Sequence, residues 1–212
     1  MTLANQLWQA NQDLAEACLN HPFVQGIGSG TLPKHKFAYY VGQDAFFLEA
    51  FGRAYSIAAA RSPDMKGFEL FHNLASGAIA ELKLHQGYAA EWGVDLNQVT
   101  PAAATRRYTD FLLSTAWANN SELTAIAMAP CMHLYLFLGQ QLAAGGIPQH
   151  RYTQWIETYS GQEFQPLVEQ LESFINQSAR DISIAHSMVS STYRYAMVCE
   201  RDFFQAAWEF ES

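Results

Sequence analysis

Apolar residues recur along this chain at intervals of three and four positions, the spacing that places side chains on one face of an α-helix. The repeat continues almost from end to end. No segment shows the strict alternation of apolar and polar residues that is typical of a half-buried β-strand. The pattern therefore predicts an all-α protein, and the 212 residues are expected to fold as a single helical domain, 1–212.

About seven or eight helices are expected, because proline, glycine and polar residues interrupt the repeat at a few places. The predicted helices cover roughly residues 3–19, Pro33 to Arg61, 66–92, a segment that opens at Pro101, 120 to Gly145, 149–176 with a break near Ser160, and 180–209. The glycine-rich residues 26–30 are expected to form a connecting loop, since they follow no strand and lack the lysine of a phosphate-binding P-loop. Thr31 is the expected cap of the helix that Pro33 opens.

Composition narrows the class of protein. Half of the residues are hydrophobic and 14% are aromatic, which is too much apolar mass for a disordered chain. The 12 basic residues are scattered and are outnumbered by 20 acidic ones, so nucleic-acid binding is not expected. The net charge of -8 fits a cytoplasmic protein, and the N-terminus shows no signal-peptide pattern.

The most apolar stretch, residues 125–139, is expected to be a buried helix. It is shorter than the ~20 residues that a membrane span needs, and Pro130 and His133 interrupt it, so no membrane association is expected. Cys131 directly follows Pro130, and Tyr135 shares its helical face four residues later. A proline inside a helix removes a backbone hydrogen bond, and such distortions leave polar groups free at a site. Cys131 is therefore a candidate nucleophile, with an inert core thiol as the alternative.

The other two cysteines, Cys18 and Cys199, lack this setting and are interpreted as structural. The three cysteines are widely spaced, odd in number and without a CxxC motif. This pattern argues against both a disulfide framework and a structural zinc site.

Two acidic residues, Asp44 and Glu200, stand among aromatic and apolar neighbours far apart in the sequence. Burying either is costly unless it is hydrogen-bonded. If the fold brings them to Cys131, the site would hold a nucleophile, a proton donor and a polar anchor. The alternatives are a structural network of Asp44 with Gln43 or a helix terminus, and a surface pairing of Glu200 with a nearby arginine, either Arg201 or Arg194.

A metal site is a competing interpretation. Glu81 and His85 are four residues apart, a spacing at which two helical side chains share a cation, and His186 is a possible third ligand. His186 stands fourteen residues before Glu200. On an unbroken helix that separation is roughly 21 Å, so these two residues would not serve one compact site.

Several short motifs together resemble one known family, although each is weak alone. They are His21-Pro22-Phe23 with Gly30-Thr31-Leu32; Tyr39-Tyr40 with Gln43-Asp44; Glu81 to His85 and Trp92-Gly93; Tyr108-Thr109-Asp110; Pro130-Cys131 with Tyr135 and Gly139; Tyr159-Ser160 with Glu163-Phe164; and Glu200 with Phe203. In this order and spacing the chain resembles the TenA/thiaminase II proteins, whose helical fold is shared with haem oxygenase. Because it carries Cys131, the chain resembles the cysteine-bearing subgroup of this family.

The resemblance implies roles for particular positions. Cys131 would be the nucleophile, Glu200 would exchange protons with a pyrimidine ring nitrogen, and Asp44 would anchor the ring and its exocyclic amine. Tyr108, Tyr135 and Tyr159 would complete the polar lining, and Phe47 and Phe203 would sandwich the flat ring. A hydrogen-bonding tyrosine, Tyr135 or Tyr159, is the candidate activator of the thiol.

The implied activity is hydrolysis of 4-amino-5-aminomethyl-2-methylpyrimidine to the hydroxymethylpyrimidine and ammonia in thiamin salvage, with thiamin cleavage as a second activity. The residues that hold the ring do not decide between these two substrates. The resemblance implies a homotetramer and no cofactor. Two alternatives stay open: a metal-dependent oxidase or oxygenase using Glu81, His85 and His186, and a pyrimidine-binding regulatory protein without turnover.

Overall fold

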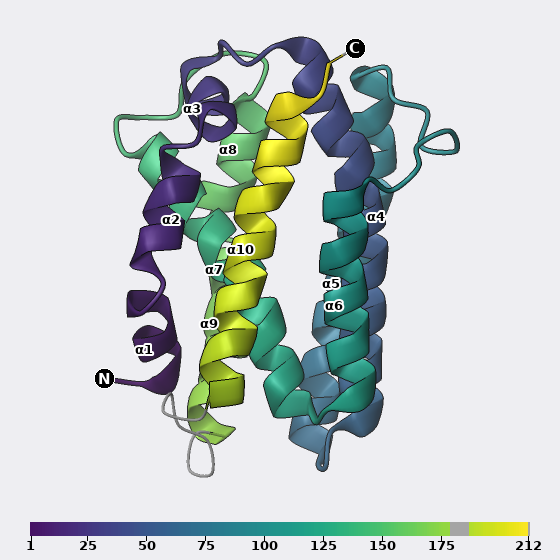
Figure 1. Ribbon diagram of the computed structural model, residues 1–212, viewed down its shortest axis with the longest axis vertical. Helices are drawn as coiled ribbons and strands as arrows, with labels where there is room; N and C mark the ends of the chain where they lie inside the picture. Colours follow the sequence, from purple (N-terminus) through teal and green to yellow (C-terminus); the bar gives the residue numbers. More distant parts are fainter. Residues whose placement is uncertain (179–186, 212) are drawn as a thin grey trace.

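The computed structural model describes residues 1–178 and 187–211, apart from the side chains of residues 84–86 and 88. Within these residues the chain forms ten helices and no strand (Figure 1). They are α1 Leu3–Gln9, α2 Gln12–Leu19, α3 Pro22–Ser29, α4 Lys34–Arg61, α5 Met65–Glu91, α6 Ala103–Ala118, α7 Ser121–Ala143, α8 Thr153–Ser160, α9 Gln165–Ser178 and α10 Ser187–Glu209. The all-α prediction is confirmed, whereas the predicted number of seven or eight helices is too low.

The first extra helix arises because the predicted helix 3–19 is divided in two. The chain leaves the helical path at Ala10 and Asn11, between α1 and α2. The buried Asn11 side chain donates a hydrogen bond to the carbonyl of Leu7 at 2.8 Å, so it satisfies the end of α1. Asparagine competes with the backbone for such bonds, which explains the break.

The second extra helix lies where a glycine-rich loop was predicted, and that prediction is wrong for residues 26–29. His21 caps α3 by accepting a hydrogen bond from the Phe23 amide, and Pro22 occupies the first turn. Gly30 ends the helix in the left-handed conformation, with φ of 76°. Glycine lowers helix propensity, but here a side chain at Gly26 would press on Leu32. Close packing therefore overrides propensity in this segment.

The long helices form a bundle around α7 (Figure 1). α4 and α5 pair along their length, and α6 packs against α4. α7 contacts α4, α6, α8, α9 and α10, so it is the central helix of the bundle. Of its most apolar 18-residue window, 72% is buried inside the protein, which is the burial expected of a core helix. The prediction of a buried helix over 125–139 is confirmed.

Pro130 stands in the middle of this central helix. Because proline has no N–H, the carbonyl of Ile126, one turn earlier, loses its helical hydrogen bond. Cys131 and Tyr135 follow within the next two turns, near the middle of α7. The sequence thus places its candidate nucleophile at the centre of the protein.

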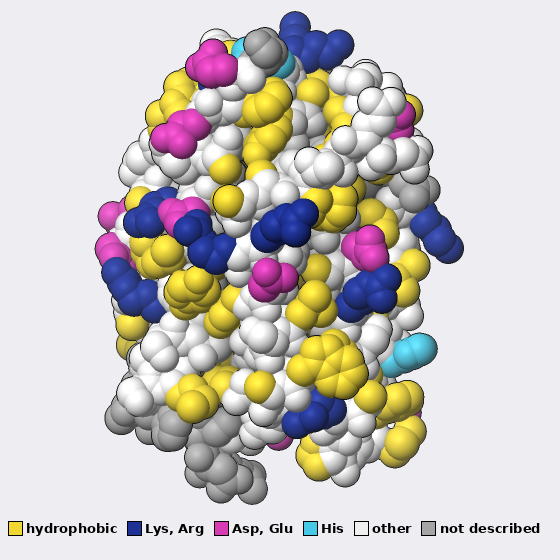
Figure 2. Space-filling view, turned by 45° about the vertical axis from the view of Figure 1, so that its right-hand side comes forward, with side chains coloured by type: hydrophobic (Ala, Val, Ile, Leu, Met, Phe, Trp, Pro, Cys, Tyr) yellow, Lys and Arg dark blue, Asp and Glu magenta, His cyan; other side chains and the backbone are white. Residues whose placement is uncertain are grey.

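The surface carries charges of both signs. On the face shown in Figure 2, Lys and Arg side chains are interspersed with Asp and Glu and with hydrophobic groups. Exposed hydrophobic side chains include Trp117, which is 66% exposed, and Ile79, which is 50% exposed.

Candidate active site

The eight residues singled out from the sequence converge on the middle of the bundle. They come from five helices: Asp44 and Phe47 from α4, Tyr108 from α6, Cys131 and Tyr135 from α7, Tyr159 from α8, and Glu200 and Phe203 from α10. Five of them, Asp44, Phe47, Cys131, Tyr135 and Tyr159, line one cavity. The other three lie behind them and contact them directly.

The cavity is small and mostly enclosed by aromatic side chains. Its volume is about 30 Å³, which is room for a water molecule or two. Leu48, Phe51, Glu81, Met132 and Phe164 complete its lining. Phe164 lies in the turn between α8 and α9 and packs edge-on against Tyr159, with ring centroids 5.2 Å apart. A ligand with a six-membered ring therefore enters only when these aromatic walls move apart.

Cys131 lies deep in the protein yet keeps part of its surface towards the cavity. Its thiol is hydrogen-bonded to the carboxyl group of Glu200. The hydroxyl of Tyr108 donates a second hydrogen bond to Oε1 of Glu200 at 2.7 Å. Glu200 is only 2% exposed, so its carboxyl group is satisfied by these hydrogen bonds rather than by water.

The alternative in which Glu200 pairs with a surface arginine is not what the structure shows. Arg201 instead binds Asp202, and Arg194 binds Asp13. Gln43, an alternative partner considered for Asp44, has its side chain hydrogen-bonded to the start of α6, where its partners are Thr100, Ala102 and Thr105. Asp44 itself faces the cavity.

Burial controls the acidity of these groups. It raises the pKa of Glu200 to about 8, while the hydrogen bonds from Tyr108 and Cys131 pull that pKa down and the charge of Asp44 pushes it up. Burial likewise raises the pKa of Asp44 to about 7. The pKa of the Cys131 thiol is raised well above its usual value by burial and then by the charge of Glu200. At neutral pH Glu200 is therefore an acid with a proton to give, and the thiol needs a proton acceptor to become a nucleophile.

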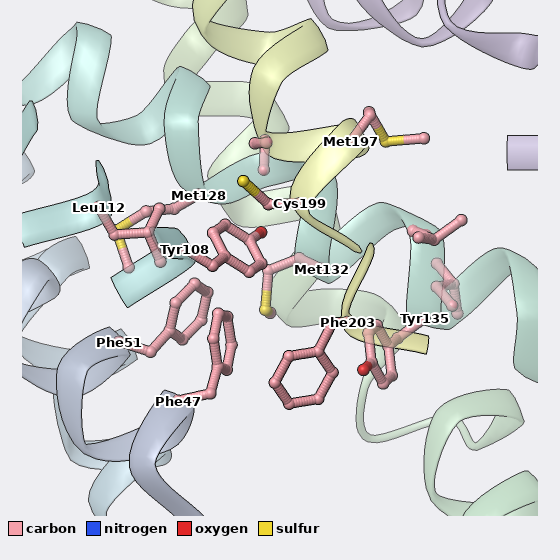
Figure 3. Packing of buried hydrophobic residues seen from close by; sticks show 14 of the residues in the cluster. Phe47, Phe51, Tyr108, Leu112, Met128, Met132, Tyr135, Met197, Cys199 and Phe203 are labelled. Atoms are coloured by element: carbon pink, nitrogen blue, oxygen red, sulfur yellow. The ribbon is translucent and has the colours of Figure 1, made fainter. Parts of the chain in front are cut away.

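Aromatic rings form the walls of the site (Figure 3). Phe47 on α4 faces Phe203 on α10, with ring centroids 6.2 Å apart. Tyr108 packs against Phe47 at 4.9 Å, and Phe51 stacks on the other side of Phe47 at 5.1 Å. These walls favour a flat, apolar-faced ligand and keep water away from the thiol.

A polar chain that the sequence analysis missed supports Tyr135. The indole N–H of Trp155 donates to the hydroxyl of Tyr40 at 3.3 Å, and Tyr40 donates to the hydroxyl of Tyr135 at 3.2 Å. Burial raises the pKa of Tyr135 well above its usual value, so it is a hydrogen-bonding group and not a base. Tyr40 lies one turn before Asp44 on the same face of α4, and that spacing was the available signal for its role.

Glu81 lies in this cavity beside Cys131, and the hydroxyl of Tyr159 donates a hydrogen bond to its Oε1 at 3.4 Å. The metal interpretation had grouped Glu81 with His85 and His186. The side chain of His85 and the whole of His186 lie outside the described residues. Within the described residues no three histidine, cysteine or acidic side chains are grouped in a way that could hold a metal ion.

Gly139 explains how Tyr159 reaches the cavity. A Cβ atom at this position of α7 would lie 2.4 Å from the carbonyl carbon of Tyr159 and 2.6 Å from the nitrogen of Ser160. Only glycine therefore allows the backbone of α8 to approach α7 so closely. The resemblance had included Gly139 as a motif position, and the structure gives the physical reason for it.

The fold matches solved structures over nearly its whole length. The chain superimposes with a TM-score of 0.90 on a TenA family transcription regulator from Silicibacter, at 26% identity over 97% of this chain and 96% of that one. It also matches heme oxygenase-1 from the cyanobacterium Synechocystis, with a TM-score of 0.63 and 18% identity, covering 97% of this chain and 92% of that one. The expectation of a haem-oxygenase-like fold is confirmed.

Sequence relatives include a protein from Halalkalibacterium halodurans named aminopyrimidine aminohydrolase. It is 31% identical over 189 residues, which cover 86% of this chain and 84% of the relative. The thiamine biosynthesis multifunctional protein ThiED of Corynebacterium efficiens is 32% identical over 206 residues, 95% of this chain. The chain spans 28% of that longer protein. A family model described as TENA/THI-4/PQQC matches residues 8–209, and the chain belongs to this family.

Proposed function

We propose that this protein is an aminopyrimidine aminohydrolase of thiamin salvage. It converts 4-amino-5-aminomethyl-2-methylpyrimidine to the hydroxymethylpyrimidine and ammonia, and it cleaves thiamin as a second activity. The observation that carries the proposal is the Cys131 thiol hydrogen-bonded to a buried Glu200 of raised pKa, inside an aromatic-walled cavity. Family membership and the name of the relative from H. halodurans support it.

The first half of the reaction activates the ring and releases the leaving group. Glu200 gives its proton to ring atom N1, which makes the neighbouring C6 electron-poor. The Glu200 carboxylate, now without its proton, takes the proton of the adjacent Cys131 thiol, and the thiolate electron pair forms the S–C6 bond. Electrons from the 4-amino group then expel the leaving group from the 5-methylene carbon, and an exocyclic methylene remains.

The second half restores the aromatic ring. Water attacks the exocyclic methylene and loses one proton, so that a hydroxymethyl group forms. The S–C6 bond breaks, the Cys131 thiolate regains its proton from Glu200, and Glu200 then takes back the proton of N1. The ring gains no atom from the protein, which acts as a true catalyst.

The remaining residues of the site orient the ring. Asp44 anchors the 4-amino group and ring, and Phe47 and Phe203 hold the two faces. Tyr108 keeps the Glu200 carboxyl group in place through the 2.7 Å hydrogen bond. Tyr135 supplies a polar contact at the wall of the cavity. Fixed dipoles in a water-excluded site stabilise the charge that develops on the ring.

The test compares wild type with Cys131→Ala, and uses Cys18→Ala as the matched control. Cys18 is fully buried away from the cavity. Release of ammonia and hydroxymethylpyrimidine is followed, with thiamin assayed in parallel. We expect Cys131→Ala to fold and to lose turnover by several orders of magnitude, as when a covalent nucleophile is removed. Turnover retained by Cys131→Ala would refute covalent catalysis.

Two further outcomes separate the alternatives. Stoichiometric iron or manganese in protein purified without chelators would favour the oxidase or oxygenase. Tight binding of hydroxymethylpyrimidine with no turnover of either substrate would favour a regulatory protein. A homotetramer and a cytoplasmic location remain predictions, and native mass spectrometry measures the first of them. Exposed Trp117 and Ile79 are compatible with contacts between subunits.

A further inference from the structure

The reaction described above leaves one carboxyl group of the cavity without a task. Glu81 lines the cavity together with Cys131 and accepts a hydrogen bond from Tyr159. It comes from α5, which packs against α4 and α9, whereas Glu200 comes from α10, which packs against α7, α6 and α2. In Figure 1 these two helices stand on different sides of the bundle. The thiol is therefore approached by two carboxyl groups from two directions.

The order of atoms in the substrate ring matches this arrangement. Carbon C6, which Cys131 attacks, is bonded to N1 on one side and to C5 on the other. When Glu200 meets N1, the methylene group on C5 lies on the opposite side of the thiol. Among the described residues, two carboxyl groups line the cavity, Asp44 and Glu81. Asp44 is already assigned to the ring and its 4-amino group. Glu81, which comes from a different side of the bundle than Glu200, is therefore the one left to meet the substituent on the methylene carbon.

We propose that Glu81, held in place by Tyr159, binds the leaving group as an ammonium ion and makes the site selective for an aminomethyl substituent over the thiazolium of thiamin. This proposal deepens the hydrolase function proposed above and rests on it. The ligand class is a primary ammonium group on a carbon next to an aromatic ring.

The chemistry requires such a group. A primary amine is a cation at neutral pH, and it leaves as neutral ammonia, with the electron pair of the C–N bond, only if it is still protonated when that bond breaks. A carboxylate at hydrogen-bond distance keeps the proton on the amine. Glu81 then accepts a proton from the water that attacks the methylene, and passes it to the departing ammonia to give ammonium.

Thiamin makes no such demand. Its thiazolium nitrogen carries a positive charge without an N–H, and it leaves as a neutral thiazole with no proton transfer. The two substrates share the pyrimidine ring and all the ring-binding residues. They therefore differ in the step that Glu81 serves.

A second feature points to the same place. Tyr55 on α4 is 1% exposed, and its hydroxyl has no hydrogen-bond partner within the described part of the chain. Its ring packs edge-on against Phe51, which lines the cavity, with ring centroids 4.7 Å apart, and burial followed by the charges of Cys131 and Glu81 raises its pKa well above the usual value. A buried hydroxyl without a partner is costly, and a polar ligand next to it repays that cost. We assign the ammonium group or the attacking water as the hydrogen-bond partner of the Tyr55 hydroxyl.

The experiment measures kcat/KM for the aminomethylpyrimidine and for thiamin in wild type and three variants. Glu81→Gln is expected to lower the ratio of the two values by roughly ten- to a hundredfold, since it replaces a charged hydrogen-bond acceptor by a neutral one. Tyr55→Phe lowers the same ratio by roughly threefold or more. Glu69→Gln, on the exposed face of the same helix, is the control and leaves both values unchanged.

A binding measurement gives a readout that does not depend on turnover. In the Cys131→Ala background, adding Glu81→Gln is expected to weaken binding of the aminomethylpyrimidine by at least tenfold and to leave the hydroxymethylpyrimidine unaffected. If Glu81→Gln does not fold, Tyr159→Phe removes the supporting hydrogen bond and is tested in the same way.

The outcomes separate the two proposals. An equal loss with both substrates, or no loss with either, overturns the role of Glu81 while the hydrolase function stands. If the wild-type protein releases neither ammonia from the aminomethylpyrimidine nor thiazole from thiamin, the hydrolase function itself is overturned. The inference is also overturned if Glu81→Gln leaves the ratio of the two kcat/KM values unchanged and, in the Cys131→Ala background, alters the binding of the two pyrimidines equally.

Discussion

The buried Glu200 makes a prediction about stability that can be tested without any substrate. Its pKa is raised from 4.5 to about 8 by burial, so the folded protein holds this proton over a pH range in which the unfolded chain has lost it. The free energy of unfolding then falls as the pH rises from about 4.5 to 8. Above pH 8 the destabilisation caused by Glu200 has reached its full size, and below about pH 4.5 it is absent.

The size of the effect follows from the shift. Each pKa unit corresponds to about 1.4 kcal/mol, so Glu200 lowers the free energy of unfolding by at most about 5 kcal/mol between pH 4 and pH 9. Glu200→Gln keeps the shape of the side chain and cannot ionise. We therefore expect the variant to match wild type near pH 4 and to be more stable by several kcal/mol at pH 9.

The assay is urea denaturation of both proteins at pH 4, 6, 8 and 9, with Glu69→Gln as an exposed control. The difference in free energy of unfolding between Glu200→Gln and wild type is plotted against pH. Asp44, whose pKa is also raised by burial, contributes a slope in both proteins below about pH 7, and the difference largely removes it. A flat difference across the whole range would refute the assignment of a raised pKa to Glu200.

Two further changes test the geometry of the site. Gly139→Ala places a methyl group 2.4 Å from the backbone of Tyr159, so we expect a loss of about 1–3 kcal/mol of stability and a lower turnover as α8 moves away. Gly77→Ala, which meets nothing within 4 Å, is its control and is expected to gain up to about 1 kcal/mol; equal behaviour of the two in thermal unfolding would contradict the argument. Tyr108→Phe removes a hydrogen bond that lowers the pKa of Glu200, so the alkaline limb of the pH profile of kcat/KM is expected to move to higher pH. If the limb stays in place, Glu200 is not the group that titrates in it.

Much of the fold could be predicted from the sequence because the helices of this chain follow from the local spacing of its apolar residues. The three- and four-residue repeat predicted the all-α class, and proline and glycine predicted most of the ends of the long helices. The short helices could not be predicted in the same way. α3 has two glycines inside it, and its packing against Leu32 and its cap at His21 support the helix.

The candidate site was likewise predictable only in part. Cys131 and Tyr135 are one turn apart on one helix, so their common face was readable from the sequence. Asp44 and Glu200 stood out as acidic residues among apolar neighbours, and the family resemblance supplied the other four positions. That Glu81 lies in the same cavity was not readable, because its partner Tyr159 stands 78 positions away. Local periodicity carries no information about such contacts.

The sequence by itself determined that this chain is helical, that its most apolar helix is buried, and that a cysteine and two acidic residues lie in apolar surroundings. Only the tertiary structure decided which groups meet that cysteine. It brings Glu200 to the thiol, removes both from bulk water and so raises the pKa of each. It also seats α8 against Gly139, which carries Tyr159 to Glu81. Acidity and proximity are properties of the packed interior, and they arise only when helices that are distant in sequence close around one cavity.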